Sequence, residues 1–228
     1  FLNETHMPMA VDRKCFNNIL EIVKVLPHYF VGSNADLPRV GGSILAHDHY
    51  QGGRHVFPME KAKGFKTVQL NKFDQVEAEL VHWPMSVIRL RSNKAEDLVE
   101  ASTFILDQWM AYSDEDLDII AYTNEERHNT ITPIARFKDG KFEMDLVLRN
   151  NRASEDYPDG IFHPHQDVHH IKKENIGLIE VMGLAVLPPR LVTELETVKA
   201  YLLGQGTLDE VTPVHQDWAE EMASNTEA

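Results

Sequence analysis

The short spacing between strand candidates most constrains what this chain can fold into. Three apolar segments with strand-like composition fall at residues 66–70, 76–82 and 86–91, with only a few residues between neighbours. A parallel connection needs a crossover of about a dozen residues or more, whereas an antiparallel pair needs only a turn. These segments therefore predict an antiparallel sheet.

Helical periodicity interrupts the strand candidates at three places. Apolar residues recur at helical spacing in residues 12–26, where Asp12 is a suitable N-cap, in residues 94–112, and after Pro189. The fold class that we expect is α+β, an antiparallel sheet with flanking helices. The remaining strands are expected at residues 29–31, 43–47, 118–122, 130–137, 142–148 and 176–187.

A repeated order of elements suggests a duplication. Each half of the chain runs through a helix and strands to a His-x-His tripeptide, first at His47-Asp48-His49 and then at His163-Pro164-His165. We therefore expect two related halves. Residues 1–91 would carry the motif His47-x-His49-x-Gln51, and residues 92–228 would form the second half.

Charge and composition exclude several classes of partner. The net charge is −14 at pH 7, so the surface repels nucleic-acid backbones and anionic lipid. We see no signal peptide and no run of 18 apolar residues, and we expect neither a membrane span nor a membrane partner. A single cysteine, Cys15, excludes a disulfide framework and a multi-cysteine zinc site, which suits the cytoplasm.

The stretch from Asp36 to Gly53 is the most informative part of the sequence. If its end is extended, His47, His49 and Gln51 share one face of the strand. Imidazoles in such a row can bind a metal, act as a base or attack an electrophile. The backbone of Gly41-Gly42-Ser43 has no bulky side chains, so its N–H groups can approach phosphate oxygens. Together these features favour phosphoryl chemistry.

These residues resemble a known family. Asn34, Gly42-Ser43 and His47-x-His49-x-Gln51 are similar to the histidine-triad superfamily, in the galactose-1-phosphate uridylyltransferase branch that has glutamine as the third residue. The whole stretch 36–53 resembles the signature of the second, bacterial class, although Arg39 stands where an aliphatic residue is usual. Residues 128–133 and 174–183 also resemble that class. Its members are longer, so this chain resembles their C-terminal portion, and we expect it to be weakly active or inactive alone.

The resemblance implies an enzyme of galactose metabolism, a nucleotidyltransferase with a ping-pong mechanism. His49 would attack UDP-glucose and form a uridylyl-histidine, from which a hexose 1-phosphate takes the uridylyl group to give UDP-galactose. Gln51 would stabilise the phosphoryl oxygens, and a backbone carbonyl would fix the tautomer of His49. The protein would be a homodimer. The residues expected to bind substrate are Asn34, Gly41, Gly42, Ser43, His47 and Glu180.

Metal binding stays open at two places. The chemistry implied by the resemblance requires no cofactor. His47 is a candidate metal ligand, with a hydrogen-bonding role as the alternative. His163 and His165, with His169 and His170 nearby in the sequence, are candidates for a structural zinc or iron site, and a surface loop rich in histidine is the alternative.

Two other functions compete with uridylyl transfer. A nucleotide hydrolase of the histidine-triad type is the first, but the amide of Gln51 cannot act as a general acid or readily activate water. The second is a non-catalytic module that binds a ligand or mediates dimer contacts. Release of UMP without an acceptor would indicate the hydrolase, and failure to bind nucleotide would indicate the module.

Overall fold

The computed structural model describes residues 1–41 and 44–225, which fall into two compact units. The first unit comprises Phe1–His163 and Asn175–Ala185. The second comprises Pro164–Glu174 and the described residues from Val186 on. These bounds differ from the predicted halves 1–91 and 92–228. A sequence duplication stays a prediction.

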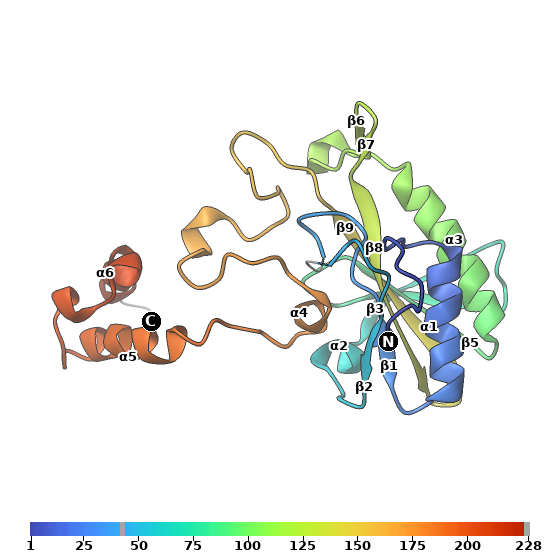
Figure 1. The fold of residues 1–228 in the computed structure, drawn as a ribbon, viewed down its shortest axis with the longest axis horizontal. Helices are drawn as coiled ribbons and strands as arrows, with labels where there is room; N and C mark the ends of the chain where they lie inside the picture. The colour runs from blue at the N-terminus through green and yellow to red at the C-terminus, as the bar shows by residue number, and fades with distance from the viewer. Residues whose placement is uncertain (42–43, 226–228) are drawn as a thin grey trace. The chain divides into compact units, whose positions relative to one another are not determined.

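One seven-stranded sheet forms the centre of the first unit, with the strand order β2-β1-β8-β9-β5-β4-β3 (Figure 1). Every pairing in it is antiparallel, which confirms the α+β prediction. The tight turn between β8 and β9 contains Asp139 and Gly140, both with positive φ. The strands are β1 (Phe30–Gly32), β2 (Gln51–Gly53), β3 (Gly64–Val68), β4 (Glu77–Val81), β5 (Val87–Ser92), β8 (Asn129–Lys138) and β9 (Lys141–Asn150).

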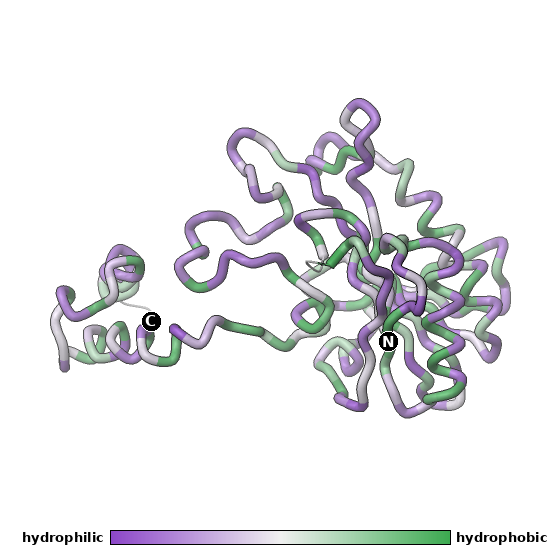
Figure 2. Tube along the Cα trace, viewed as in Figure 1, coloured by the Kyte–Doolittle hydropathy of each residue, from purple (hydrophilic) through white to green (hydrophobic). Residues whose placement is uncertain are grey.

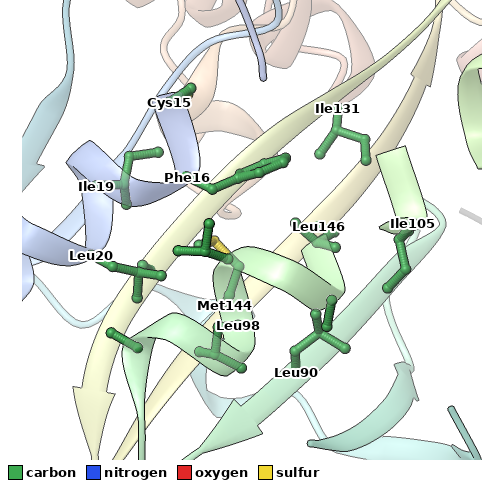
Figure 3. Close-up of a cluster of buried hydrophobic side chains, with 14 of the residues drawn as sticks. Cys15, Phe16, Ile19, Leu20, Leu90, Leu98, Ile105, Ile131, Met144 and Leu146 are labelled. Atoms are coloured by element: carbon green, nitrogen blue, oxygen red, sulfur yellow. The ribbon is translucent and has the colours of Figure 1, made fainter. Parts of the chain in front are cut away.

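Helices α1 (Arg13–Val25) and α3 (Ala95–Met110) lie side by side and cover one face of the sheet (Figure 1). Asp12 caps α1 as predicted, since its carboxylate accepts a hydrogen bond of 2.9 Å from the Cys15 N–H. Hydrophobic and hydrophilic residues alternate along α1 in Figure 2, and Figure 3 shows the apolar side chains meeting those of the sheet. This layer is the main core.

The opposite face of the sheet carries a second apolar layer. The short helices α2 (Pro58–Lys61) and α4 (Leu178–Val181) place Met59 and Leu178 in one cluster with Ile134 and Val147 of the sheet. Their sequence neighbours Ala135 and Leu146 belong to the other core, because side chains alternate across a strand. A separate two-stranded sheet joins β6 (Tyr122–Thr123) and β7 (Glu126–Arg127).

Several strand predictions were wrong. Residues 44–47 form no strand, and Ser43 lies outside the part of the chain that the structure describes. Residues 176–187 contain α4 and turns in place of a strand. The segment 118–122 is not a continuous strand either. It follows the 3₁₀ helix η1 (Glu115–Leu117), and only its last residue, Tyr122, belongs to a strand, β6. Periodicity cannot distinguish a strand from a helical turn in so short an apolar run.

The second unit is built from short helices, α5 (Leu191–Leu202) and α6 (Gln216–Ser224), and the 3₁₀ helices η2 (Gln166–Val168), η3 (Leu208–Glu210) and η4 (Pro213–His215). Its small core contains Val198, Val211 and Ala219. The helix predicted after Pro189 is confirmed as α5. Across the described ranges of both units, no helix is long and apolar enough to cross a membrane.

Candidate active site

Residues 47–51 alternate between the two sides of an extended segment. Asp48 and Tyr50 are buried, and the Tyr50 hydroxyl lies 3.0 Å from Asn18 of α1. His47, His49 and Gln51 are only partly buried on the other side. The structure therefore brings these three predicted site residues to one face, as the alternation of side chains along an extended chain requires.

His49 is held by a hydrogen bond to its own backbone segment. Its Nδ1 atom lies 2.8 Å from the carbonyl oxygen of His47. A carbonyl oxygen can only accept, so Nδ1 of a neutral imidazole carries the proton and Nε2 carries the lone pair. This contact orients the ring and leaves the lone pair on Nε2. The expectation that a backbone carbonyl fixes the tautomer of His49 is confirmed.

Gln51 begins β2 and pairs with Gly32 of β1. A Cβ atom added at Gly32 would lie 2.9 Å from the Pro133 carbonyl oxygen, so the backbone beside Gln51 has no room for a side chain. The Oε1 atom of Gln51 is buried and has no hydrogen-bond partner among the described residues. Rotation of the amide places Nε2 there, so Gln51 can offer an N–H donor at this position.

His47 has both ring nitrogens engaged. Nε2 lies 3.0 Å from the Asn3 carbonyl oxygen and Nδ1 lies 2.8 Å from Nδ1 of His6. Since the carbonyl only accepts, Nε2 of a neutral His47 carries the proton and Nδ1 accepts from His6. These contacts favour the hydrogen-bonding alternative, because a metal on His47 would displace one of them.

No metal cluster supports the other candidate ligands. Within residues 1–41 and 44–225, no group of three or more His, Cys, Asp or Glu side chains is arranged to hold a metal ion. His163 lies in the first unit and His165 in the second. Zinc or iron binding by His47, His163 or His165 stays a prediction.

Residues 1–9 run beside the motif, which the sequence did not indicate. The backbone N–H groups of Asn3 and Met9 donate to the carbonyls of Asp48 and Leu45, over 3.2 and 2.9 Å. His6 reaches His47 from this segment. Residues 1–9 have neither strand-like alternation nor a motif, so their position depends on contacts that only the folded chain brings together.

Asn34 and Glu180 meet at the start of α4. The Asn34 Oδ1 atom accepts a hydrogen bond of 2.8 Å from the Leu178 N–H. The Glu180 Oε2 atom accepts one of 2.9 Å from the Gly177 N–H. Both predicted substrate-binding side chains therefore satisfy free N–H groups at a helix start. Their role toward a substrate stays a prediction.

The loop before the histidines is tightly folded. A Cβ atom at Gly41 would lie 2.5 Å from the Ala35 carbonyl oxygen, so this position requires glycine. Asp36 anchors the loop, since its carboxylate accepts from Thr130 over 2.5 Å and from Arg127 over 2.9 Å. Gly42 and Ser43 lie outside the described residues, and their phosphate-binding role stays a prediction.

Comparison with known proteins identifies relatives over nearly the whole chain. Residues 22–220 match the family model described as galactose-1-phosphate uridyl transferase, C-terminal domain. A galactose-1-phosphate uridylyltransferase of Streptococcus thermophilus (strain CNRZ 1066) is 60% identical over 222 residues, which are 97% of this chain and 45% of that protein. One of Clostridium perfringens (strain 13 / Type A) is 58% identical over 221 residues, 97% of this chain and 44% of that protein. The chain thus spans less than half the length of these curated relatives.

A solved structure also matches part of the fold. It belongs to a DUF4931 family protein from Bacillus cereus ATCC 10987. The match has 15% sequence identity and a TM-score of 0.41, and it covers 66% of this chain and 72% of that chain.

Proposed function

Because this chain belongs to the galactose-1-phosphate uridyl transferase family, we propose that it takes part in uridylyl transfer from UDP-glucose to galactose 1-phosphate. The observation that best supports this proposal is the hydrogen bond of 2.8 Å between His49 Nδ1 and the His47 carbonyl. It leaves the lone pair on Nε2, which is the arrangement a histidine nucleophile needs.

In the first half-reaction, the Nε2 lone pair of His49 attacks the α-phosphorus of UDP-glucose. A bond forms between nitrogen and phosphorus, and the bond from that phosphorus to the bridging oxygen breaks. Glucose 1-phosphate leaves with the electron pair of the broken bond. The His47 carbonyl stabilises the positive charge that develops on the ring, because it accepts the Nδ1 proton.

In the second half-reaction, a phosphate oxygen of galactose 1-phosphate attacks the uridylyl phosphorus. The nitrogen–phosphorus bond breaks, its electron pair returns to Nε2, and UDP-galactose leaves. The Gln51 amide donates a hydrogen bond to a phosphoryl oxygen in both steps and is too weak an acid to protonate a leaving group. An amide in this place favours transfer to a sugar phosphate over attack by water.

The other predicted residues would position the substrates. The N–H groups of the loop through Gly41, Gly42 and Ser43 would contact phosphate oxygens. Asn34 and Glu180 would contact hydroxyl groups of ribose or hexose near the start of α4, where their side chains already lie. His47 would hold the nucleophile's segment in place. The homodimer that the resemblance implies, and a cytoplasmic location, are part of this proposal.

An exchange assay tests the proposal. Labelled glucose 1-phosphate is incubated with UDP-glucose and no galactose 1-phosphate, using this chain alone and fused behind the N-terminal portion of the Streptococcus thermophilus relative. A covalent uridylyl-enzyme lets label enter UDP-glucose, because the first half-reaction is reversible. We expect exchange by the fused protein, and loss of it in His49→Ala.

His28→Ala is the matched control, because His28 is exposed, binds Arg54 and belongs neither to the motif nor to residues 1–9 beside it. It should exchange label at the wild-type rate. No exchange in either form of the wild-type chain would contradict the proposal. Release of UMP from UDP-glucose without any acceptor, at the rate of turnover, would indicate a nucleotide hydrolase.

A further inference from the structure

Arg149, near the end of β9, is a buried cation without an ionic partner among the residues that the structure describes. Only 7% of its surface is exposed. Its guanidinium makes two long contacts with neutral oxygens, 3.4 Å to Thr132 Oγ1 and 3.3 Å to the Ile176 carbonyl. Both exceed the 2.7–3.2 Å that is usual for such a hydrogen bond. Within the described ranges, no carboxylate lies at ion-pair distance from Arg149.

Two other buried arginines on the same sheet show what such a group normally requires. Arg89 and Arg136 are 1% and 5% exposed. Arg89 donates to Asp145 over 2.6 and 2.9 Å, and Arg136 pairs with Asp145 and with Glu143. These two cations are therefore compensated by carboxylates, whereas Arg149 is compensated by none in the part of the chain that the structure describes.

A buried charge without a counterion destabilises a fold. Burial lowers the pKa of Arg149 to about 10, and no carboxylate acts to raise it. Even so, the guanidinium stays charged at pH 7. An apolar side chain of similar size needs no counterion at this position, so the stability of the fold does not account for an arginine here.

The position of Arg149 connects it with the proposed active site. The strand registers place Gln51, Asp145 and Arg149 on one face of the sheet, with the strand of Arg149 three places from that of Gln51 in the strand order. Arg149 lines a pocket of about 240 Å³ with Val40, the residue before the glycine loop, and with Asn150. Most of its other lining residues are apolar, among them Trp109 and Leu148, and Arg149 is its one cationic lining residue in the described part of the chain. The carbonyl that it contacts belongs to Ile176, two residues before Leu178, which binds Asn34.

We infer that Arg149 binds a phosphate group of the substrate in this pocket, and only the identity of the phosphate carrier rests on the proposed function. Phosphate oxygens accept two parallel N–H bonds from a guanidinium, which gives both charge compensation and orientation. The carrier is either the sugar 1-phosphate or the uridylyl group. The lining residues named here belong to this chain, so binding can be tested on the chain alone.

Calorimetry and thermal unfolding of this chain test the inference, with inorganic phosphate, galactose 1-phosphate and UMP as probes. Arg149→Met should weaken binding of phosphate by about tenfold or more, since hydrogen bonds to a charged group are lost. Without ligand it should unfold at the wild-type temperature or above, because an uncompensated charge is removed. Arg149→Lys should recover part of the affinity.

Arg152→Gln is the matched control. Arg152 is three residues away, carries the same charge and pairs with Asp118, so its loss should leave phosphate binding unchanged. A loss in Arg149→Met confined to galactose 1-phosphate assigns the sugar phosphate, and a loss shared with UMP assigns the uridylyl phosphate. Unchanged affinity in Arg149→Met, or no binding of any probe by the wild type, overturns the inference. The exchange assay reports on uridylyl transfer separately.

Discussion

At the scale of single residues, the proposed function makes Gln51 the residue that decides between transfer and hydrolysis. Its amide can donate a hydrogen bond but is too weak an acid and too weak a base for general acid–base catalysis near pH 7. Gln51→His would put a titrating imidazole beside the phosphoryl group, where it can protonate a leaving group and activate water. We expect release of UMP from UDP-glucose without acceptor to rise by about tenfold or more.

Gln51→Ala is the companion variant, because it removes the amide without adding a base. It should lose transfer and gain no hydrolysis. Chromatographic measurement of UMP over time, in the fused protein, distinguishes the variants. If Gln51→His releases no more UMP than the wild type, the amide does not determine the choice of acceptor.

At the same scale, the sequence predicted the face of the motif but not its support. The shared face of His47, His49 and Gln51 follows from the alternation of side chains in an extended chain. This alternation does not depend on which residues the chain contains. The contacts of His47 with Asn3 and His6 join residues about 40 positions apart. No local sequence pattern predicts a contact between residues so far apart.

At the scale of elements, strands β5, β8 and β9 are joined by buried charges on one face of the sheet. Asp145 is fully buried and accepts hydrogen bonds from Arg89 and Arg136. Although burial acts to raise it, the two guanidinium groups lower the pKa of Asp145 below its usual value. Asp145→Asn removes a negative charge that compensates both cations. We expect it to lower the free energy of unfolding by about 3–5 kcal/mol in urea titrations at pH 7.

The pH dependence of stability provides a second readout for Asp145. Its lowered folded-state pKa stabilises the fold above the unfolded pKa of about 3.9, and this contribution is lost as pH falls toward the folded pKa. Wild-type protein should therefore lose stability more steeply than Asp145→Asn below about pH 4. Parallel acid-unfolding curves for the two proteins would contradict the assignment.

The elements that the sequence predicted well are those with strong local signals. Asp12 and the apolar face of α1 gave both the start and the buried side of that helix. The start of α4 depends instead on Asn34, which lies 144 positions away along the chain and binds the Leu178 N–H. Glu180 caps the Gly177 N–H locally, but the partner of the Leu178 N–H is distant in the sequence. The apolar run alone therefore predicts a strand here, which is wrong.

At the scale of the whole molecule, the excess of acidic residues is the dominant property. The formal net charge is −14, and repulsion among these charges destabilises the compact state. Raising NaCl from about 0.01 M to about 0.15 M shortens the Debye length from about 30 Å to about 8 Å. We expect the thermal midpoint to rise by a few degrees. A midpoint that falls with salt would show that attractive surface pairs outweigh the repulsion.

The central claim concerns one atom, Nε2 of His49. Because Nδ1 is bound to the His47 carbonyl, the uridylyl group should form on Nε2. The most direct measurement is phosphorus–nitrogen correlation NMR on ¹⁵N-histidine-labelled fused protein after incubation with UDP-glucose. We predict one phosphoramidate signal, on Nε2 of His49, that is absent in His49→Ala. A uridylyl group on Nδ1 or on another histidine, or no adduct at all, would contradict the account.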